Sequence, residues 1–138
     1  MKKIASSTLK SIFESFPEII AVYLFGSYLE EPAQAQDVDV AVLLAQRKGI
    51  VDLYTRLHPR LEEIFAPLEV DLLFLNLISV PMTFEVISKG KVIYCVDDER
   101  RTDFEYLVSG LYMDYQYHLR QAQRELYEAI KEASGVVQ

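Results

Sequence analysis

The sequence predicts a single α/β domain in which a small mixed β-sheet is flanked by helices and followed by a long C-terminal helix. Four short apolar runs rich in β-branched residues alternate with amphipathic segments, which is the pattern of strands and helices in one α/β unit. From Asp97 to about Ala133 the helical spacing continues, with Gly110 as the only weak point. The chain has 138 residues, of which 51% are hydrophobic, so one self-sufficient core is feasible.

The first elements are a helix and a buried strand. Residues 7–16 place apolar side chains three and four positions apart, and Pro17 stops that helix. Ile19–Phe25 is a dense run of β-branched and aromatic residues that ends at Gly26, which is typical of a buried strand. Residues 27–36 are polar and contain a proline, so we expect a turn with at most one helical turn.

A strand, a helix and a third strand follow. Val38–Leu44 reads as a second buried strand. Ile50–Phe65 carries its leucines on one face, and Pro59 within it is expected to kink or divide the helix. Val70–Leu75 is the third buried strand.

The rest of the chain is a short helix, an edge strand and a long helix. Val80–Lys89 is predicted to be helical with Gly90 as its C-cap, and Val92–Val96 to be a fourth strand at a sheet edge. From Asp97 the pattern stays helical to about Ala133. Its predicted apolar stripe comprises Phe104, Leu107, Leu111, Tyr115, His118, Ala122, Leu126 and Ala129.

This C-terminal helix is too long for the domain that it follows. Its stripe spans about seven turns, or roughly 38 Å, whereas a domain of about 100 residues has a radius of gyration near 13 Å. We therefore divide the chain into a core of residues 1–96 and a helix of residues 97–138. We expect the overhanging end to pack on another chain, in a homodimer or a hetero-oligomer.

Charge and composition narrow the classes of function. The chain has 21 acidic and 14 basic residues, a formal charge of −7, which opposes non-specific binding to nucleic acid or to an anionic membrane. An acidic protein that handles phosphate needs a local device such as a metal ion. A single cysteine, Cys95, which we expect to be a small buried residue, favours a reducing compartment. With no signal-peptide pattern and no apolar run of about 20 residues, we expect a cytoplasmic protein.

Two carboxylates begin the second strand. Asp37 and Asp39 are two residues apart, so they point to the same side of a strand, and Val38 and Val40 point to the other. Like charges at that separation repel. A divalent cation relieves the repulsion, and paired carboxylates with water and phosphate oxygens are the ligands that Mg²⁺ prefers.

Asp71 supplies a third carboxylate from an independent segment. It is the second residue of the third strand, which a helix connects to the second strand. Such a connection usually makes the two strands parallel, so both begin at the same sheet end. If the strands are neighbours, Asp71 lies beside Asp37 and Asp39. The alternative is that these acids are solvated strand ends, as Asp97-Asp98 is a helix start.

A Gly-Ser pair is expected at the same sheet end. The first strand ends at Gly26 and Ser27, and the short connection to Asp37 favours an antiparallel pair of strands. Glycine permits close approach of the backbone to a ligand. Ser27 and the backbone N–H groups that follow it could hold phosphate. Alone the pair is an ordinary turn, and its interest comes from its position beside the acids.

Together these residues resemble a known family. Phe25-Gly26-Ser27, the pair Asp37 and Asp39, and Glu69-Val70-Asp71 are similar to the motifs of the DNA polymerase β-type nucleotidyltransferase superfamily. Within it the chain most resembles the minimal nucleotidyltransferase (MNT) group. The resemblance covers roughly residues 9–95. The tail from Arg100 into a tyrosine-rich helix resembles, with less specificity, MntA-type antitoxins, which pair with HEPN toxins.

The resemblance implies a nucleotidyltransferase fold, an activity and a partner. Gly26 and Ser27 would bind the phosphates of ATP. Asp37 and Asp39 would bind Mg²⁺, and Asp71 would help to hold metal or accept the proton of the attacking hydroxyl. The reaction would move AMP from ATP to a hydroxyl, most simply a tyrosine of a HEPN RNase toxin. The number of metal ions stays open.

The chain departs from the family pattern between the two motifs. Nine residues, Tyr28–Gln36, separate Ser27 from Asp37 where the family usually has ten, and Glu30-Glu31 stands where a further glycine and a basic residue are common. Weaker nucleotide binding is one consequence of such a segment. Three hypotheses therefore stand: an adenylylating antitoxin, a weakly catalytic module that masks a HEPN partner by binding, and a small-molecule nucleotidyltransferase.

Overall fold

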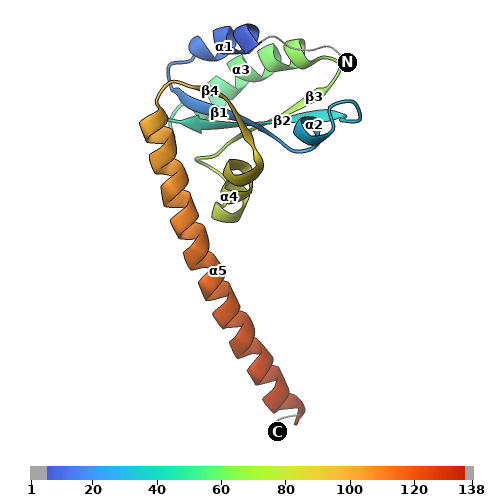
Figure 1. Ribbon diagram of the computed structural model, residues 1–138, viewed down its shortest axis with the longest axis vertical. Coiled ribbons are helices and arrows are strands. Elements are labelled where there is room, and N and C mark those ends of the chain that lie inside the picture. Colours follow the sequence, from blue (N-terminus) through green and yellow to red (C-terminus); the bar gives the residue numbers. More distant parts are fainter. Residues whose placement is uncertain (1–5, 136–138) are drawn as a thin grey trace.

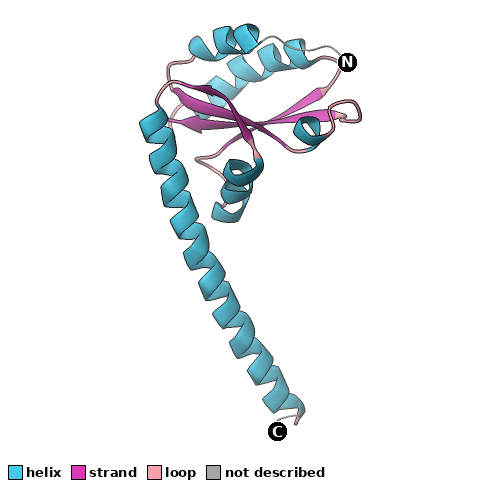
Figure 2. Cartoon of the chain, in the orientation of Figure 1, coloured by secondary structure: helices cyan, strands magenta, loops and turns pink. Residues whose placement is uncertain are grey.

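The computed structural model describes residues 6–135, which form alternating helices and strands (Figures 1 and 2). The helices and strands follow each other along the chain as the sequence predicts, with ends shifted by one or two residues. In chain order they are α1 (Ser6–Glu14), β1 (Ile19–Phe25), α2 (Ser27–Glu30), β2 (Asp37–Leu44), α3 (Ile50–Phe65), β3 (Glu69–Phe74), α4 (Val80–Lys89), β4 (Lys91–Cys95) and α5 (Asp98–Ser134).

The strands form a mixed sheet in the order β3-β2-β1-β4. β2 and β3 are parallel neighbours, as the strand–helix–strand connection through α3 predicts. β1 is antiparallel to both β2 and β4, and β4 lies at an edge. α1 and α3 cover one face of this sheet, and α4 and the beginning of α5 cover the other (Figure 1). The predicted α/β fold with a small mixed sheet and a long C-terminal helix is confirmed.

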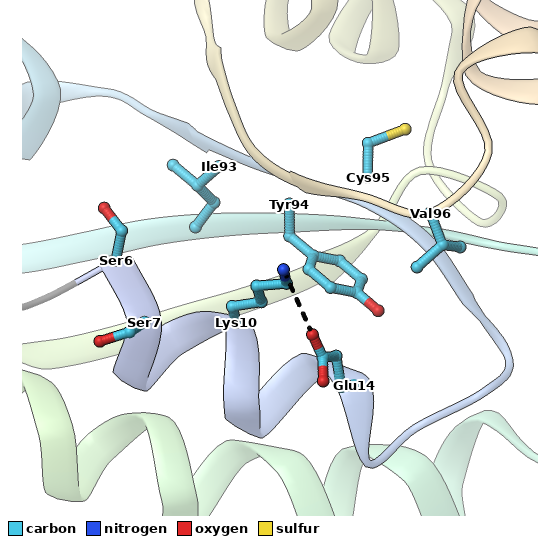
Figure 3. Close-up of a pocket in the computed structure, with 8 residues that line it drawn as sticks. All are labelled: Ser6, Ser7, Lys10, Glu14, Ile93, Tyr94, Cys95 and Val96. Atoms are coloured by element: carbon cyan, nitrogen blue, oxygen red, sulfur yellow. Dashed lines mark ion pairs between the residues drawn. The ribbon is translucent and has the colours of Figure 1, made fainter.

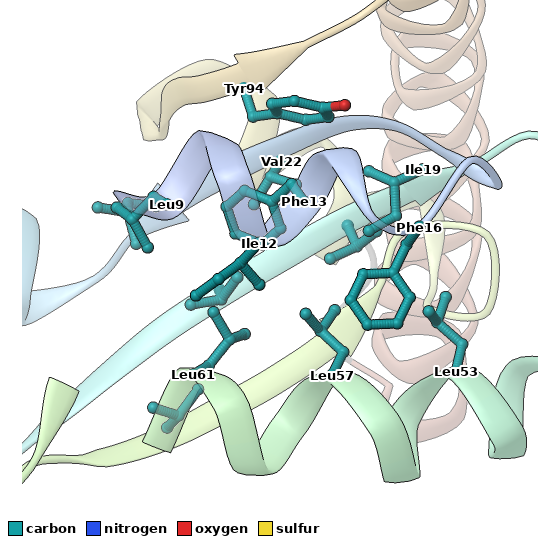
Figure 4. Packing of buried hydrophobic residues seen from close by; sticks show 14 of the residues in the cluster. Leu9, Ile12, Phe13, Phe16, Ile19, Val22, Leu53, Leu57, Leu61 and Tyr94 are labelled. Carbon is teal, nitrogen blue, oxygen red and sulfur yellow. The ribbon is translucent and has the colours of Figure 1, made fainter. Parts of the chain in front are cut away.

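The larger part of the core lies between the sheet and helices α1 and α3. Phe13 of α1 and Leu57 of α3 are completely buried, and they meet the inward-facing valines of β1 and β2 (Figure 4). The ring of Phe13 also packs at 5.5 Å from that of Tyr94 in β4. Val38 and Val40 point into this core, so the acids that alternate with them are directed to the opposite face.

The opposite face carries a smaller core and a buried polar contact with α5. Tyr23 of β1 is 1% exposed, and its hydroxyl donates a hydrogen bond of 2.7 Å to Glu105. Arg101 in turn donates to Glu105 at 3.0 Å. Burial, followed by the bond to Glu105, raises the pKa of Tyr23, so the phenol stays a neutral donor. This contact fixes the rotation of the first turns of α5 against the sheet.

Two predictions about the helices are wrong in part. α3 runs without division through Pro59, because the buried leucines on either side, Leu57 and Leu61, hold both turns against the sheet. In α5, Val108 faces the core, whereas Leu107 and Leu111 of the predicted stripe are 58% and 44% exposed. The contact between Tyr23 and Glu105 sets this rotation, and an apolar pattern alone does not specify it.

The long helix does extend beyond the rest of the chain (Figure 2). Asp97 caps its beginning by accepting a hydrogen bond of 3.1 Å from the backbone N–H of Arg100, as the helix-start interpretation of Asp97-Asp98 requires.

Within residues 6–135, no helix combines the length and the hydropathy that crossing a membrane requires.

Candidate functional site

Three carboxylates meet at one end of the sheet. β2 and β3 are paired in a register that sets Asp39 directly opposite Asp71, and Asp37 opposite Glu69. One carboxylate oxygen of each of Asp37, Asp39 and Asp71 lies within 4.8 Å of the others. Across residues 6–135, no other group of three such ligating side chains comes together. The structure thus brings together the three acids that the sequence analysis selected.

Repulsion among these three carboxylates contributes to the pKa of Asp39, the central residue of the cluster. Partial burial, then the charges of Asp37 and Asp71 and a hydrogen bond with Asp71, raise the pKa of Asp39 to about 6. The local environment therefore opposes full ionisation of the cluster when it stands alone. Such a cluster gains free energy from a nearby positive charge.

The donor set suits a hard divalent cation. All three side chains offer oxygen ligands, and a cation such as Mg²⁺ binds through one or two carboxylates and leaves other positions for water and phosphate oxygens. Asp37 and Asp39 are half-buried and Asp71 is exposed, so the cluster is open to solvent on the side of Asp71. The residues present therefore fit Mg²⁺, with Asp37, Asp39 and Asp71 as its candidate ligands.

The turn after β1 lies directly against this cluster. Phe25 is paired with Asp39, and the next residue, Gly26, has φ of +80° and ψ of −161°, a backbone conformation that favours glycine. A Cβ atom at Gly26 would overlap the carboxylate of Asp39. Gly26 is therefore required here both for its backbone conformation and for the close approach of Asp39.

The helical turn α2 starts from the same glycine. The carbonyl oxygen of Gly26 accepts hydrogen bonds from the backbone N–H groups of Leu29 at 3.1 Å and Glu30 at 3.3 Å. The ring of Tyr28 anchors the turn by meeting Phe65 of α3 edge-on, with centroids 5.7 Å apart. Ser27 stays exposed at the start of the turn. It directly follows Gly26, which lies against Asp39.

A cation that sequence reasoning missed lies close to the acidic segment. β4 pairs with β1 so that Lys91 stands opposite Leu24, which brings the end of α4 near the Gly-Ser turn. The pKa of Lys89 is raised by a hydrogen bond and ion pair with Glu85, and to a smaller extent by the charge of Glu30. No local signal predicts this proximity, because it depends on pairing between strands about 70 residues apart in the sequence.

A hollow lies on the other face of the sheet, between α1 and β4 (Figure 3). It has a volume of about 340 Å³, and Lys10 and Glu14 form an ion pair of 3.7 Å across its wall. Cys95 lines it and is half-buried, not buried as expected, because β4 is an edge strand. This hollow contains none of the three clustered carboxylates.

The stability of the metal-free protein provides a first test of the cluster. A carboxyl whose pKa is raised on folding stabilises the protein below its unfolded value of 3.8, and that contribution is lost as the pH rises through about 6. Asp39→Asn keeps the shape and removes the charge. We expect it to stabilise the protein at pH 8 in EDTA by about 1 kcal/mol after allowance for solvent screening, or about 4 °C in Tm.

Two further measurements distinguish relief of charge repulsion from a general stabilising effect of the Asp39→Asn substitution. The gain in Tm should shrink as the pH falls from 7 to 4, where Asp39 becomes protonated in the folded wild type. Added Mg²⁺ should raise the Tm of the wild type and leave that of Asp39→Asn nearly unchanged. A variant that is destabilised at pH 8, or one that responds fully to Mg²⁺, would contradict the repulsive cluster.

Solved structures resemble the chain over most of its length. A toxin–antitoxin MntA-HpeT mutant has a TM-score of 0.70 at 22% identity and covers 91% of this chain and 99% of its own. A toxin–antitoxin structure with AMP-PNP has a TM-score of 0.66 at 21% identity, with coverage of 90% and 99%. The tri-AMPylated Shewanella oneidensis HEPN toxin in complex with MNT antitoxin gives 0.62 at 21%, with 88% and 95%. At these identities the likeness is one of fold.

A family assignment comes from the sequence itself. No curated protein matches the chain. The family model described as "Polymerase beta, Nucleotidyltransferase" matches residues 7–99, a span that contains the Gly-Ser turn and all three clustered acids. Since that match covers more than half of the chain, the protein belongs to the polymerase beta nucleotidyltransferase family.

Proposed function

We propose that the protein is a Mg²⁺-dependent nucleotidyltransferase that moves AMP from ATP to a hydroxyl, most simply a tyrosine of a cognate HEPN-type toxin, and so acts as an antitoxin. The observation that carries this proposal is the cluster of Asp37, Asp39 and Asp71 directly beside Gly26 and Ser27. Membership of the nucleotidyltransferase family supports the reaction class. The similar solved structures named above, among them a complex with a tri-AMPylated HEPN toxin, support the choice of partner.

In this reaction the chain's own residues position and deprotonate the reactants. The acceptor oxygen forms a bond to the α-phosphorus of ATP, and the bond from that phosphorus to the bridging oxygen breaks, so that pyrophosphate leaves. Asp71, the exposed member of the cluster, would accept the hydroxyl proton. Gly26 and Ser27 orient the phosphates. Bound Mg²⁺ would neutralise charge on the phosphate oxygens.

The net charge supports a protein acceptor. With a formal charge of −7, the chain has no general attraction for a polyanionic nucleic acid. A free nucleotide instead experiences only the electrostatic potential at the site, and a bound cation can make that potential positive. The open side of the carboxylate cluster leaves room for an acceptor side chain carried by another protein.

Two other functions fit part of the observations. A module that neutralises a HEPN partner by binding alone would keep the fold but not need the carboxylates, and the acidic Glu30-Glu31 segment favours that possibility. A small-molecule nucleotidyltransferase would use the same chemistry. Enzymes of that kind usually carry a further substrate domain, whereas residues 6–135 form one small α/β fold and a long helix. A neighbouring gene for a small all-helical protein with an Arg-x4–6-His motif would favour the first two functions over the third.

The decisive experiment measures the mass of that helical partner after incubation with this protein, ATP and Mg²⁺. We expect the partner to gain one or more AMP units, and tandem mass spectrometry should place them on tyrosine. The gain should disappear in EDTA. An unmodified partner whose RNase activity is nevertheless inhibited would contradict the transfer reaction and support masking by binding.

Lys89 provides a test of whether the negative charge of the Glu30-Glu31 segment weakens ATP binding. Because the negative charge of Glu30 contributes to the raised pKa of Lys89, Lys89→Met removes a positive charge that partly offsets Glu30 near the expected phosphate site. We expect the KM for ATP to rise about threefold, with little change in kcat, since a surface charge contributes only modestly. Adding Glu30→Gln should restore the KM. Lys48→Met, an exposed lysine in the turn before α3, is the control.

A further inference from the structure

The far half of α5 has a face that nothing in the described chain covers. Near its beginning the helix is held by buried Val108 and by the stacking of Tyr112 on Phe84 of α4, with ring centroids 4.1 Å apart. Beyond these contacts it continues to Ser134, away from the sheet (Figure 1). Leu126 is 61% exposed and Ile130 is 56% exposed. An exposed helix of this length that keeps large apolar residues indicates a packing partner.

Six apolar positions on this stretch follow a heptad spacing, whereas Tyr117, Tyr127 and Ile130 lie off that row. Steps of four and three residues lead from Val108 and Tyr112, which pack on the core, to a row that continues without interruption along the free part of the helix. A seven-residue repeat is the pattern of helices that pair side by side along their length. We call this row the distal seam; it consists of Tyr115, Leu119, Ala122, Leu126, Ala129 and Ala133.

The side-chain sizes along the distal seam are complementary to those of a second distal seam that runs in the opposite direction. When two copies run antiparallel about a point level with residue 124, Leu126 of one copy meets Ala122 of the other, and Leu119 meets Ala129. Tyr115 likewise meets Ala133. Every layer then contains one large and one small side chain, which fills space evenly between closely spaced helices. We propose that the distal seam pairs antiparallel with the distal seam of a second copy of this chain.

A parallel pair would be poorly packed. It would set Ala122 against Ala122 and Ala129 against Ala129, leaving gaps, while the leucine layers between them hold the helices apart. Antiparallel pairing is also self-complementary under a two-fold axis, as an isologous interface requires.

The flanking residues fit the antiparallel arrangement. In this register His118 of one copy faces Glu132 of the other, twice per dimer, and Gln123 faces Gln123 across the axis, where two amides can bond each other. Glu125 faces Glu125 once, at the edge of the pair. The two contacts between His118 and Glu132 and the one amide pair stand against a single repulsion at the exposed edge of the dimer.

The geometry allows both cores to fit. The seam spans 19 residues from Tyr115 to Ala133, or about 27 Å, and each core is attached before the seam begins. In an antiparallel pair the two cores therefore lie at opposite ends and do not meet. A strip of one helix width is smaller than a standard interface of about 1,600 Å², so we expect a dimer with a micromolar dissociation constant. This pairing does not depend on the proposed enzymatic function.

The oligomeric state of the full chain tests the proposal. Sedimentation equilibrium should show a concentration-dependent dimer for the wild type. Leu126→Glu should weaken it at least about 100-fold, because each dimer loses two buried leucines. Tyr127→Glu is the matched control: Tyr127 is also 61% exposed but lies off the seam, so its dimer should persist. A wild type that stays monomeric at high micromolar concentration, or equal effects of the two variants, would overturn the proposal.

Cross-linking tests the direction of pairing. In a Cys95→Ser background, Leu119→Cys and Ala129→Cys chains are made separately and oxidised alone and as a mixture. Because the antiparallel register brings residue 119 of one copy to residue 129 of the other, the disulfide should form between the two variants in the mixture and not within either alone. Circular dichroism checks that each variant remains helical. Linking of Leu119→Cys to itself would indicate parallel pairing and would refute the register.

Discussion

Replacing Asp39 by alanine should reduce AMP transfer on the order of 10³-fold, which corresponds to about 4 kcal/mol of transition-state stabilisation. Asp39 lies at the centre of the cluster, opposite Asp71 across the β2–β3 pair and next to Asp37 in the same face of β2. Its loss removes a candidate metal ligand and also the contact with the Gly-Ser turn. Initial rates of partner modification, followed by mass spectrometry, provide the measurement.

The matched control removes an acid elsewhere. Asp103→Ala takes away the same charge from an exposed position near the start of α5, so it should transfer AMP at the wild-type rate. Size-exclusion chromatography of each variant with the helical partner, without ATP, checks that binding is retained. If Asp39→Ala binds the partner and modifies it at an undiminished rate, Asp39 has no part in the chemistry.

The arrangement of the acids could be predicted because it depends on simple regularities. A period of two places Asp37 and Asp39 on one face of β2, and a strand–helix–strand connection makes β3 parallel to β2. Both strands begin with an acidic residue, a valine and an aspartate, so parallel pairing in register is enough to bring Asp71 next to Asp39. The order of helices and strands follows from apolar spacing and from prolines and glycines for the same reason: each signal is local.

Features that depend on contacts between distant segments could not be read in this way. The rotation of α5 is set by the bond between Tyr23 and Glu105, 82 residues apart, so apolar spacing alone selected Leu107 in place of Val108. Gly90 was predicted as a C-cap, and its backbone N–H does bond the carbonyl oxygen of Val86. Its φ of −76° is ordinary, and what excludes a side chain is the carbonyl oxygen of Val86, with the carbonyl oxygen of Leu24 from the distant strand β1 also close.

The second large effect, on both the transfer rate and the stability, is expected for Gly26→Ala. At φ of +80° an alanine is strained, and its Cβ would overlap the carboxylate of Asp39. We expect transfer to fall about 100-fold, because either Asp39 or the phosphate-binding turn must move from its position. Stability should fall by about 1–3 kcal/mol, measured by urea denaturation.

Gly49→Ala separates the two causes. Gly49 also has a positive φ, +69°, but no atom lies within 4 Å of the position of its Cβ, so the variant reports backbone strain alone. It should lose stability and keep its transfer rate. Because Gly26 acts through Asp39, adding Gly26→Ala to Asp39→Ala should cost little further activity, and additive losses would contradict this coupling. In the Asp39→Ala background the carboxylate is gone, so Gly26→Ala should also destabilise the fold less than it does in the wild type.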